Sequence, residues 1–163
     1  MTQESTSKSW IVLVQCIALC LAVELSAGWL TSFSVNTWYP TLVKPSWTPP
    51  SWIFGPVWTL LYISMGVSLW LIWRKNQSVE NNNLVPYIFF GVQLFLNFLW
   101  SGLFFGLRSP ELALIDIMAL WFAIGGTVVS FWQVDKFAAL LLIPYWAWVT
   151  FAAVLNAAIR VLN

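Results

Sequence analysis

Long apolar stretches alternate with short linkers along this chain. A helix needs about 20 apolar residues to cross the hydrocarbon core of a bilayer. Stretches of that length predict helices at residues 10–33, 52–73, 84–106, 111–132 and 137–159. We therefore expect an all-α integral membrane protein, in which residues 1–163 form a single domain, one bundle of five transmembrane helices.

Two features of the linkers refine this topology. The linkers 107–110 and 133–136 are short, so the third, fourth and fifth helices should be antiparallel neighbours. The first apolar stretch follows Lys8, as the apolar core of a signal peptide follows a basic residue. It runs for 24 residues, however, whereas a signal core has roughly 7–15. We expect it to be a spanning helix.

Residues 34–51 join the first two predicted helices, and we call this linker the lid loop. The segment Trp38–Trp52 holds four prolines, three tryptophans, one tyrosine and one lysine in fifteen residues. So many prolines exclude a regular helix, and a solvated linker would be rich in glycine, serine or charge instead. We expect a compact loop whose aromatic rings rest on an apolar surface.

The composition supports a membrane protein and excludes several functions. Charged residues make up 8% of the chain and hydrophobic residues 60%, against about 25% charged in an ordinary globular domain. A net charge of +1 without a basic run gives no sign of nucleic-acid binding. The absence of histidine excludes a histidine-based zinc or haem site, and we expect no metal site. Cys16 and Cys20, four residues apart on one apolar helix, favour packing over a disulfide or metal site.

The tryptophans have more than one explanation. Indole rings favour the membrane–water interface, and six lie near the ends of predicted helices: Trp10, Trp29, Trp52, Trp70, Trp73 and Trp132. Five lie deeper in the predicted helices and need another account: Trp58, Trp100, Trp121, Trp146 and Trp148.

Polar side chains in spanning helices usually face the bundle interior or a cavity, because lipid offers them no partner. Helical spacing groups several of them with aromatic side chains on one face of each helix. These faces are Phe54, Trp58, Tyr62 and Met65; Gln93, Asn97, Trp100 and Phe104; Asp116, Leu120, Ala123 and Thr127; and Tyr145, Trp148, Ala152 and Asn156. At about 1.5 Å per residue, most of their ring-bearing and polar positions lie in the half of the bilayer beneath the lid loop.

This clustering predicts a cavity walled by aromatic rings, with a few amides and one carboxylate, capped by the lid loop. Such a lining suits a large, flat, mostly apolar ligand with polar edges. The alternative is that tryptophan and tyrosine only fill space between helices, and that Asn97 and Asn156 bridge helices by hydrogen bonds.

Two further features concern helix contacts. Glu24 lies deep in the first helix, either as a protonated hydrogen-bond donor between helices or as part of a proton relay, and the sequence does not choose between these roles. Gly102 and Gly106 form a G-x-x-x-G motif, which permits close helix contact. This motif hints at a homodimer formed through the third helix.

Two sets of motifs are specific enough to suggest a family. The first set is Trp38-Tyr39, Lys44-Pro45-Ser46-Trp47-Thr48-Pro49-Pro50, Val57-Trp58, Leu61-Tyr62 and Met65-Gly66. The second set is Asn97-x-x-Trp100, Phe104-Phe105-Gly106, Ala113-Leu114-Ile115-Asp116, Pro144-Tyr145, Trp148 and Leu155-Asn156. In order and spacing, over nearly the whole chain, they resemble the translocator protein family, also called tryptophan-rich sensory proteins.

The resemblance implies a homodimer of five-helix subunits with a pocket under the first loop. That pocket would bind porphyrins such as protoporphyrin IX, other haem-pathway tetrapyrroles and drug-like molecules, with no covalently bound cofactor. The residues that match family pocket positions are Trp38, Trp47, Trp58, Asn97, Trp100, Asp116, Tyr145 and Trp148. Tyr62 and Asn156, from the helical faces above, complete the predicted ligand-binding set.

The resemblance also bears on sterols. Animal members bind cholesterol near the end of the fifth helix, through a motif with a tyrosine before a terminal arginine. The segment Val154–Arg160 has alanine where that tyrosine would fall, and such motifs are weak in any case. We therefore expect no specific cholesterol binding, and a bacterial member that lies in the cell membrane.

Three functions compete. The first is a membrane receptor, sensor or transporter for tetrapyrroles. The second is a porphyrin-degrading enzyme that depends on light and oxygen, as some bacterial members are reported to be, with Trp58 and Trp148 at the implicated positions. The third is an ion-coupled transporter that uses Glu24 or Asp116, and the lack of inverted repeats or broken spanning helices weighs against it.

Overall fold

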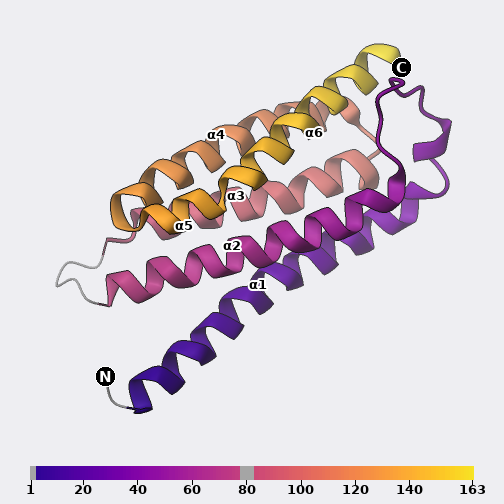
Figure 1. The fold of residues 1–163 in the computed structure, drawn as a ribbon. Helices are drawn as coiled ribbons and strands as arrows, with labels where there is room; N and C mark the ends of the chain where they lie inside the picture. Colours follow the sequence, from indigo (N-terminus) through magenta and orange to yellow (C-terminus); the bar gives the residue numbers. More distant parts are fainter. Residues whose placement is uncertain (1–2, 78–82) are drawn as a thin grey trace.

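The computed structural model describes residues 3–77 and 83–163, and in this part of the chain five helices are long and apolar enough to span a membrane. Figure 1 shows them as one elongated bundle. The prediction of an all-α, multi-pass membrane protein is confirmed. The helices are α1 (Gln3–Val35), α2 (Phe54–Asn76), α3 (Val85–Ser101), α4 (Pro110–Val134), α5 (Lys136–Leu141) and α6 (Ile143–Leu162).

The spans close into a ring. Helix α1 contacts α2 and α3, α3 contacts α4, α4 contacts α5 and α6, and α5 contacts α2. The expected antiparallel neighbours are therefore side by side, as Figure 1 also shows for α3, α4 and the fifth span. Helix α1 lies at the edge of the bundle. In its most apolar 18-residue segment 11% of the residues are buried, against 33–44% in the corresponding segments of the other spans.

Two spanning helices are irregular, which corrects the expectation of unbroken helices. The third span ends in a π-helical turn, η3 (Gly102–Gly106), in which the Leu107 N–H donates to the Gly102 carbonyl over 2.8 Å. The fifth span is divided at Leu142 into α5 and α6. Pro144 explains that break, because proline has no N–H and its ring clashes with the carbonyl four residues earlier.

Hydroxyl groups of α2 support this break. The Ser64 hydroxyl donates to the Leu141 carbonyl over 2.8 Å, and the Ser68 hydroxyl donates to the Ala138 carbonyl over 2.7 Å. Backbone groups freed within a membrane need such partners, because lipid supplies none. The two serines thereby fix the fifth span against α2.

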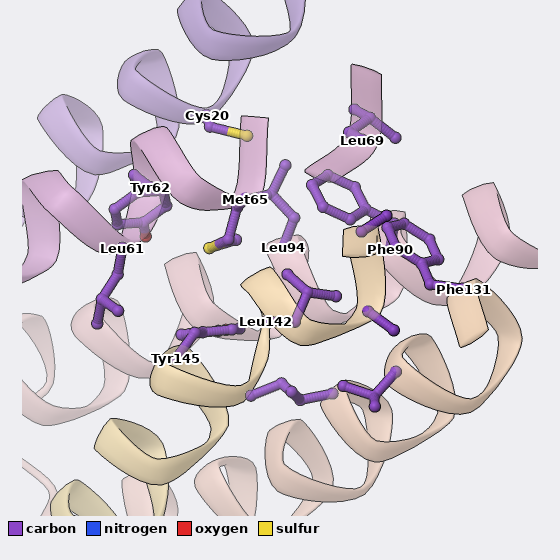
Figure 2. Close-up of a cluster of buried hydrophobic side chains, with 14 of the residues drawn as sticks. Cys20, Leu61, Tyr62, Met65, Leu69, Phe90, Leu94, Phe131, Leu142 and Tyr145 are labelled. Carbon is purple, nitrogen blue, oxygen red and sulfur yellow. The ribbon is translucent and has the colours of Figure 1, made fainter. Parts of the chain in front are cut away.

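The half of the bundle away from the lid loop is solidly packed. Figure 2 shows side chains from several spans meeting there, with the rings of Phe90 and Phe131 stacked 6.0 Å apart. Met65 is fully buried among them, and Tyr62 and Tyr145 lie at the end of this cluster nearest the lid loop. Both cysteines are free and buried, as predicted for packing residues.

Helices α1 and α2 are in close contact at Gly66. A Cβ atom on Gly66 would lie 2.7 Å from the Cα of Ile17, closer than real side chains come. At Gly28 on α1 and Gly55 on α2, by contrast with Gly66, an added Cβ would meet nothing within 4 Å. The two helices are thus in backbone contact at one level and leave open space nearer the lid loop.

The lid loop is compact, as expected, and holds two 3-10 turns, η1 (Tyr39–Thr41) and η2 (Ser51–Ile53). The Lys44 ammonium organises its first half, because it donates to the carbonyls of Tyr39 (2.8 Å) and Leu42 (2.9 Å) and lies 4.8 Å from the centre of the Tyr39 ring. Lysine satisfies backbone groups that a proline-rich segment cannot pair within itself.

The tryptophans follow the predicted division in part, because Trp70 and Trp73, predicted for the interface, are half-buried. Those predicted for the interface include four exposed rings: Trp10, Trp29, Trp52 and Trp132. The deeper rings are all half-buried: Trp58, Trp100, Trp121, Trp146 and Trp148. Two of the deeper rings, Trp121 and Trp146, pack against each other between α4 and α6 with ring centres 5.0 Å apart.

Candidate functional site

A cavity of about 240 Å³ opens beneath the lid loop. Its lining residues come from α1, α2, α3 with η3, α6 and the lid loop, and none of them comes from α4. Six predicted ligand-binding residues are among them: Trp58, Tyr62, Asn97, Trp100, Trp148 and Asn156. The sequence therefore located the hollow correctly in the lid-side half of the bundle.

Eight of the 21 residues that line the cavity are aromatic. Trp100 stacks on Phe104 with ring centres 5.1 Å apart and planes 22° apart. Trp148 of α6 packs against Phe54 of α2 with ring centres 5.8 Å apart. Trp58 packs against Tyr62, also on α2, with the same distance between ring centres. Rings held against other rings keep fixed orientations, so the wall offers flat apolar faces at defined angles.

The floor of the cavity is a chain of hydrogen bonds between three helices. The Tyr62 hydroxyl donates to Asn97 Oδ1 (2.7 Å), Asn97 Nδ2 donates to the Tyr145 oxygen (2.8 Å), and the Tyr145 hydroxyl donates to Gln93 Oε1 (2.8 Å). All four side chains are buried. Hydrogen-bonded networks rigidify the structure around them, so the floor is a fixed surface, although the buried Gln93 Nε2 has no hydrogen-bond partner among the described residues.

Asn156 has a similar role on the α6 wall. Its Oδ1 accepts a hydrogen bond from Trp100 Nε1 (3.1 Å), and its Nδ2 donates to the Pro110 carbonyl (2.7 Å). The amide thus ties α6 to the start of α4 and sets the orientation of the Trp100 ring. The alternative raised by the sequence, that Asn97 and Asn156 bridge helices, is correct, and both residues also line the cavity.

Four predicted site residues lie outside the cavity lining. Trp38 packs behind the wall on Phe104 at 5.6 Å, and Trp47 packs on Phe151 at 5.9 Å. Tyr145 is fully buried beneath the floor. Asp116 is buried on α4, the span that contributes no lining residue, and within the described residues its Oδ2 finds no hydrogen-bond partner.

One wall of the cavity, formed by α1, was not predicted from the sequence. Helix α1 lines the cavity with a stripe of small and polar residues at helical spacing: Glu24, Ala27, Gly28, Thr31 and Val35. The spacing of small residues in an otherwise bulky helix gives only a weak signal, and the aromatic pattern of the other spans is much stronger. Lid-side aromatic residues also belong to the lining without having been assigned to the site: Tyr39, Phe54, Phe104 and Phe105.

Tyr39 is the aromatic residue that the lid loop itself contributes. Its ring lies 5.8 Å from Phe105 and 6.3 Å from Phe104. Burial raises the pKa of the Tyr39 hydroxyl above its ordinary value, because the phenolate form would lose its water. The hydroxyl is therefore neutral, and Tyr39 adds an apolar ring and a neutral polar tip to the cavity.

The two glycines predicted for a dimer contact differ in their surroundings. An added Cβ on Gly102 would lie 3.9 Å from the Leu30 side chain of the same chain, whereas an added Cβ on Gly106 would meet nothing within 4 Å. Gly106 is also exposed. Of the two, Gly106 leaves its face open to another molecule.

Residues 16–162, which include the lid loop and every wall of the cavity, match the model of the TspO/MBR family. The chain belongs to the TspO/MBR family. Its relatives include a tryptophan-rich protein TspO of Chlorobaculum tepidum, 46% identical over 96% of this chain and 99% of the relative. The tryptophan-rich protein TspO of Archaeoglobus fulgidus is 46% identical over 93% of this chain and 96% of its own length. The human translocator protein is 42% identical over 73% of this chain and 70% of its own length.

The family membership confirms the resemblance seen in the motifs. The match to the TspO relatives covers nearly the full length of both chains. The tryptophan-rich sensory protein of Cereibacter sphaeroides, 32% identical over 90% of this chain and 88% of its own, belongs to the same group. This chain is thus a membrane protein of the TspO, translocator and sensory-protein group.

Proposed function

We propose that this TspO-family protein binds porphyrins, with protoporphyrin IX as the test ligand, in the cavity beneath the lid loop, and acts as a membrane sensor, receptor or transporter for tetrapyrroles. The observation that supports this most is the aromatic wall. Trp58, Trp100 and Trp148 present fixed ring faces from three different helices to one hollow. Stacked and edge-to-face contacts with such rings suit a flat aromatic ligand.

The size of the hollow limits how a porphyrin would sit. Pockets for drug-sized molecules have about 300–1,000 Å³, and this cavity has about 240 Å³. A whole macrocycle therefore requires the cavity to widen or the ligand to insert one edge. The proposed entry side is the gap at Gly28 and Gly55, where the α1–α2 wall lacks side chains. Among the described residues that line the cavity there is no lysine or arginine, so the propionate groups would remain outside, towards the lid loop.

Quenching of tryptophan fluorescence by protoporphyrin IX tests the proposal. Saturable quenching is expected in the wild type, with weaker affinity in Trp58→Ala and Trp148→Ala. Trp10→Phe is the matched control, because Trp10 is exposed on α1 and does not line the cavity. No saturable quenching, or the same affinity in both cavity variants as in the control, would contradict porphyrin binding at this site.

A second candidate function is porphyrin degradation driven by light. The observation that favours it is that Trp58 and Trp148 both line the cavity, where their indoles could donate an electron to an excited porphyrin while O₂ serves as the oxidant. Illuminated protein should then lose porphyrin absorbance faster than Trp58→Phe and Trp148→Phe variants with equal bound porphyrin. Equal rates in all three proteins would reject this mechanism.

We also propose that the protein is a homodimer through the third span. Gly106 supports this, because it is exposed in the π-helical turn and leaves room for a close approach.

A further inference from the structure

Glu24 is an unusual feature of the cavity that porphyrin binding does not use. Among the residues that line the cavity it is the one carboxyl group, and none of the others is a lysine or arginine. It lies about 16 Å along α1 from Val35, the lid-side end of that helix, and close to residue 22, the midpoint of the span Ser9–Val35. A carboxyl group at this depth is costly and usually has a function.

The contacts of Glu24 leave it incompletely paired. The Thr59 hydroxyl donates to Glu24 Oε1 over 2.6 Å, and this bond joins α1 to α2. No second hydrogen bond and no ion pair to this carboxyl group is found among residues 3–77 and 83–163. One carboxyl oxygen is therefore available to something that enters the cavity.

The two amide side chains that line the cavity are already occupied. Asn97 uses its oxygen for Tyr62 and its nitrogen for Tyr145, and Asn156 is bound in the same way by Trp100 and Pro110. Against these paired amides, Glu24 is the strongest free acceptor that faces the hollow. Its natural partner is a group with positive charge.

The aromatic wall favours the same kind of ligand. A cation is attracted to the faces of tryptophan, tyrosine and phenylalanine rings, and quaternary ammonium groups are recognised by aromatic cages. Trp58, Trp100 and Trp148 line the same hollow as Glu24. Rings that attract a cation, beside a carboxylate that lacks a counter-ion, form the two halves of an organic-cation site.

We infer that this cavity binds small lipophilic organic cations, an aromatic or aliphatic body with one ammonium group, and that Glu24 is the counter-ion that selects them over neutral molecules of the same shape. The volume fits this class, because about 240 Å³ suits a single ring with a compact ammonium group better than a macrocycle. Gly28 and Gly55 line the cavity and are exposed, so we place the entry of such a ligand at this point of the α1–α2 wall.

A pair of probes that differ only in charge tests the inference. Benzyltrimethylammonium carries the charge, and neopentylbenzene has the same shape with carbon in place of nitrogen. Both are titrated against the protein in nanodiscs of phosphatidylcholine, a lipid without net charge, and tryptophan fluorescence is followed. The wild type should bind the cation saturably and at least tenfold more tightly than the neutral probe.

Two variants assign the effect to the carboxylate. Glu24→Gln keeps the shape and the acceptor for Thr59 but removes the negative charge, and it should lose at least tenfold in cation affinity with little change for neopentylbenzene. Thr59→Val removes the hydrogen bond but keeps the carboxylate, and it should keep the preference for the cation. A wild type with no preference for the charged probe, or a Glu24→Gln variant with unchanged cation affinity, overturns the inference.

The outcome is independent of porphyrin binding. Protoporphyrin IX has no fixed positive charge, so the comparison of the two probes reports on the counter-ion separately from porphyrin binding. The wild-type comparison of the two probes needs no variant, and therefore decides the question even if a substitution at Glu24 prevents folding. Porphyrin binding without cation preference would overturn this inference alone, whereas cation preference without porphyrin binding would support it and contradict only the proposed function.

Discussion

Asn163 holds Val43 by both of its backbone groups. The Val43 N–H donates to Asn163 Oδ1 and Asn163 Nδ2 donates to the Val43 carbonyl, each over 3.0 Å. The same Nδ2 also donates to the Ile159 carbonyl over 2.8 Å, which fixes the side chain to the last turn of α6. The lid loop is thus fastened to α6 at a point 120 residues away in sequence.

Asn163→Ala should loosen the lid loop without unfolding the bundle. Each hydrogen bond contributes about 0.5–1.5 kcal/mol, and both lie at an exposed site. We expect porphyrin to dissociate several-fold faster, with little change in the thermal midpoint, as measured by stopped-flow fluorescence. Asn163→Asp keeps the acceptor for the Val43 N–H and should give an intermediate rate. An unchanged dissociation rate in Asn163→Ala would show that this contact does not control the lid loop.

Asn156→Leu should destabilise the protein and disturb the cavity wall. The substitution leaves the Trp100 N–H and the Pro110 carbonyl without their partners, and an unsatisfied buried group costs about 1–3 kcal/mol. Denaturant unfolding in detergent should show a loss of that order, together with weaker porphyrin binding. Asn156→Asp keeps the acceptor for Trp100 and should retain more affinity. Equal stability of the wild type and Asn156→Leu would mean that the amide does not anchor Trp100.

Gly66→Ala should separate α1 from α2. The new methyl group would lie 2.7 Å from the Ile17 Cα, and backbone cannot move aside as a side-chain end can. Overpacking of this kind costs about 1–3 kcal/mol. Gly91→Ala is the control, because an added Cβ at Gly91 on α3 meets nothing within 4 Å. A thermal midpoint in Gly66→Ala that is no lower than in Gly91→Ala would refute the close contact.

Gly106→Leu should reduce dimer formation. If the third span forms the interface, a large side chain at the exposed end of the G-x-x-x-G motif prevents close approach. Substitution of Gly102 is a poorer test, since its neighbour Leu30 belongs to the same chain. Size-exclusion chromatography with light scattering in detergent measures the mass. A Gly106→Leu variant that is as dimeric as the wild type would exclude this face.

The sequence predicted the five spans because bilayer thickness sets a length that each apolar run must reach. It also predicted the lid-side cavity, because helical spacing puts rings and amides on the same face. Helical spacing shows which residues share one face of a helix, but it does not show which other helix, or which cavity, that face contacts. Asp116 shares a face with other polar positions, yet α4 turns that face to the packed interior. Tyr145 likewise points beneath the cavity floor.

The missing wall has a different cause. Helix α1 lines the cavity with residues such as Ala27 and Gly28, whose small size carries little periodic signal. The break at Leu142 was missed although Pro144 is visible in the sequence, because an apolar run continues through it and hydropathy does not register a proline. Glu24 was noticed, but its partner Thr59 lies 35 residues away on another helix, and only the fold brings them together.

A ligand in the hollow beneath the lid loop should protect a cysteine introduced there from alkylation. Ala152→Cys places a thiol in the cavity lining, and Ala147→Cys places one on the exposed face of the same helix, α6. The native Cys16 and Cys20 are buried, and the unsubstituted protein gives the background labelling. Protoporphyrin IX should slow alkylation of the cysteine at position 152 by a small maleimide at least several-fold and leave the rate at position 147 unchanged. Equal rates at position 152 with and without saturating porphyrin would contradict the account.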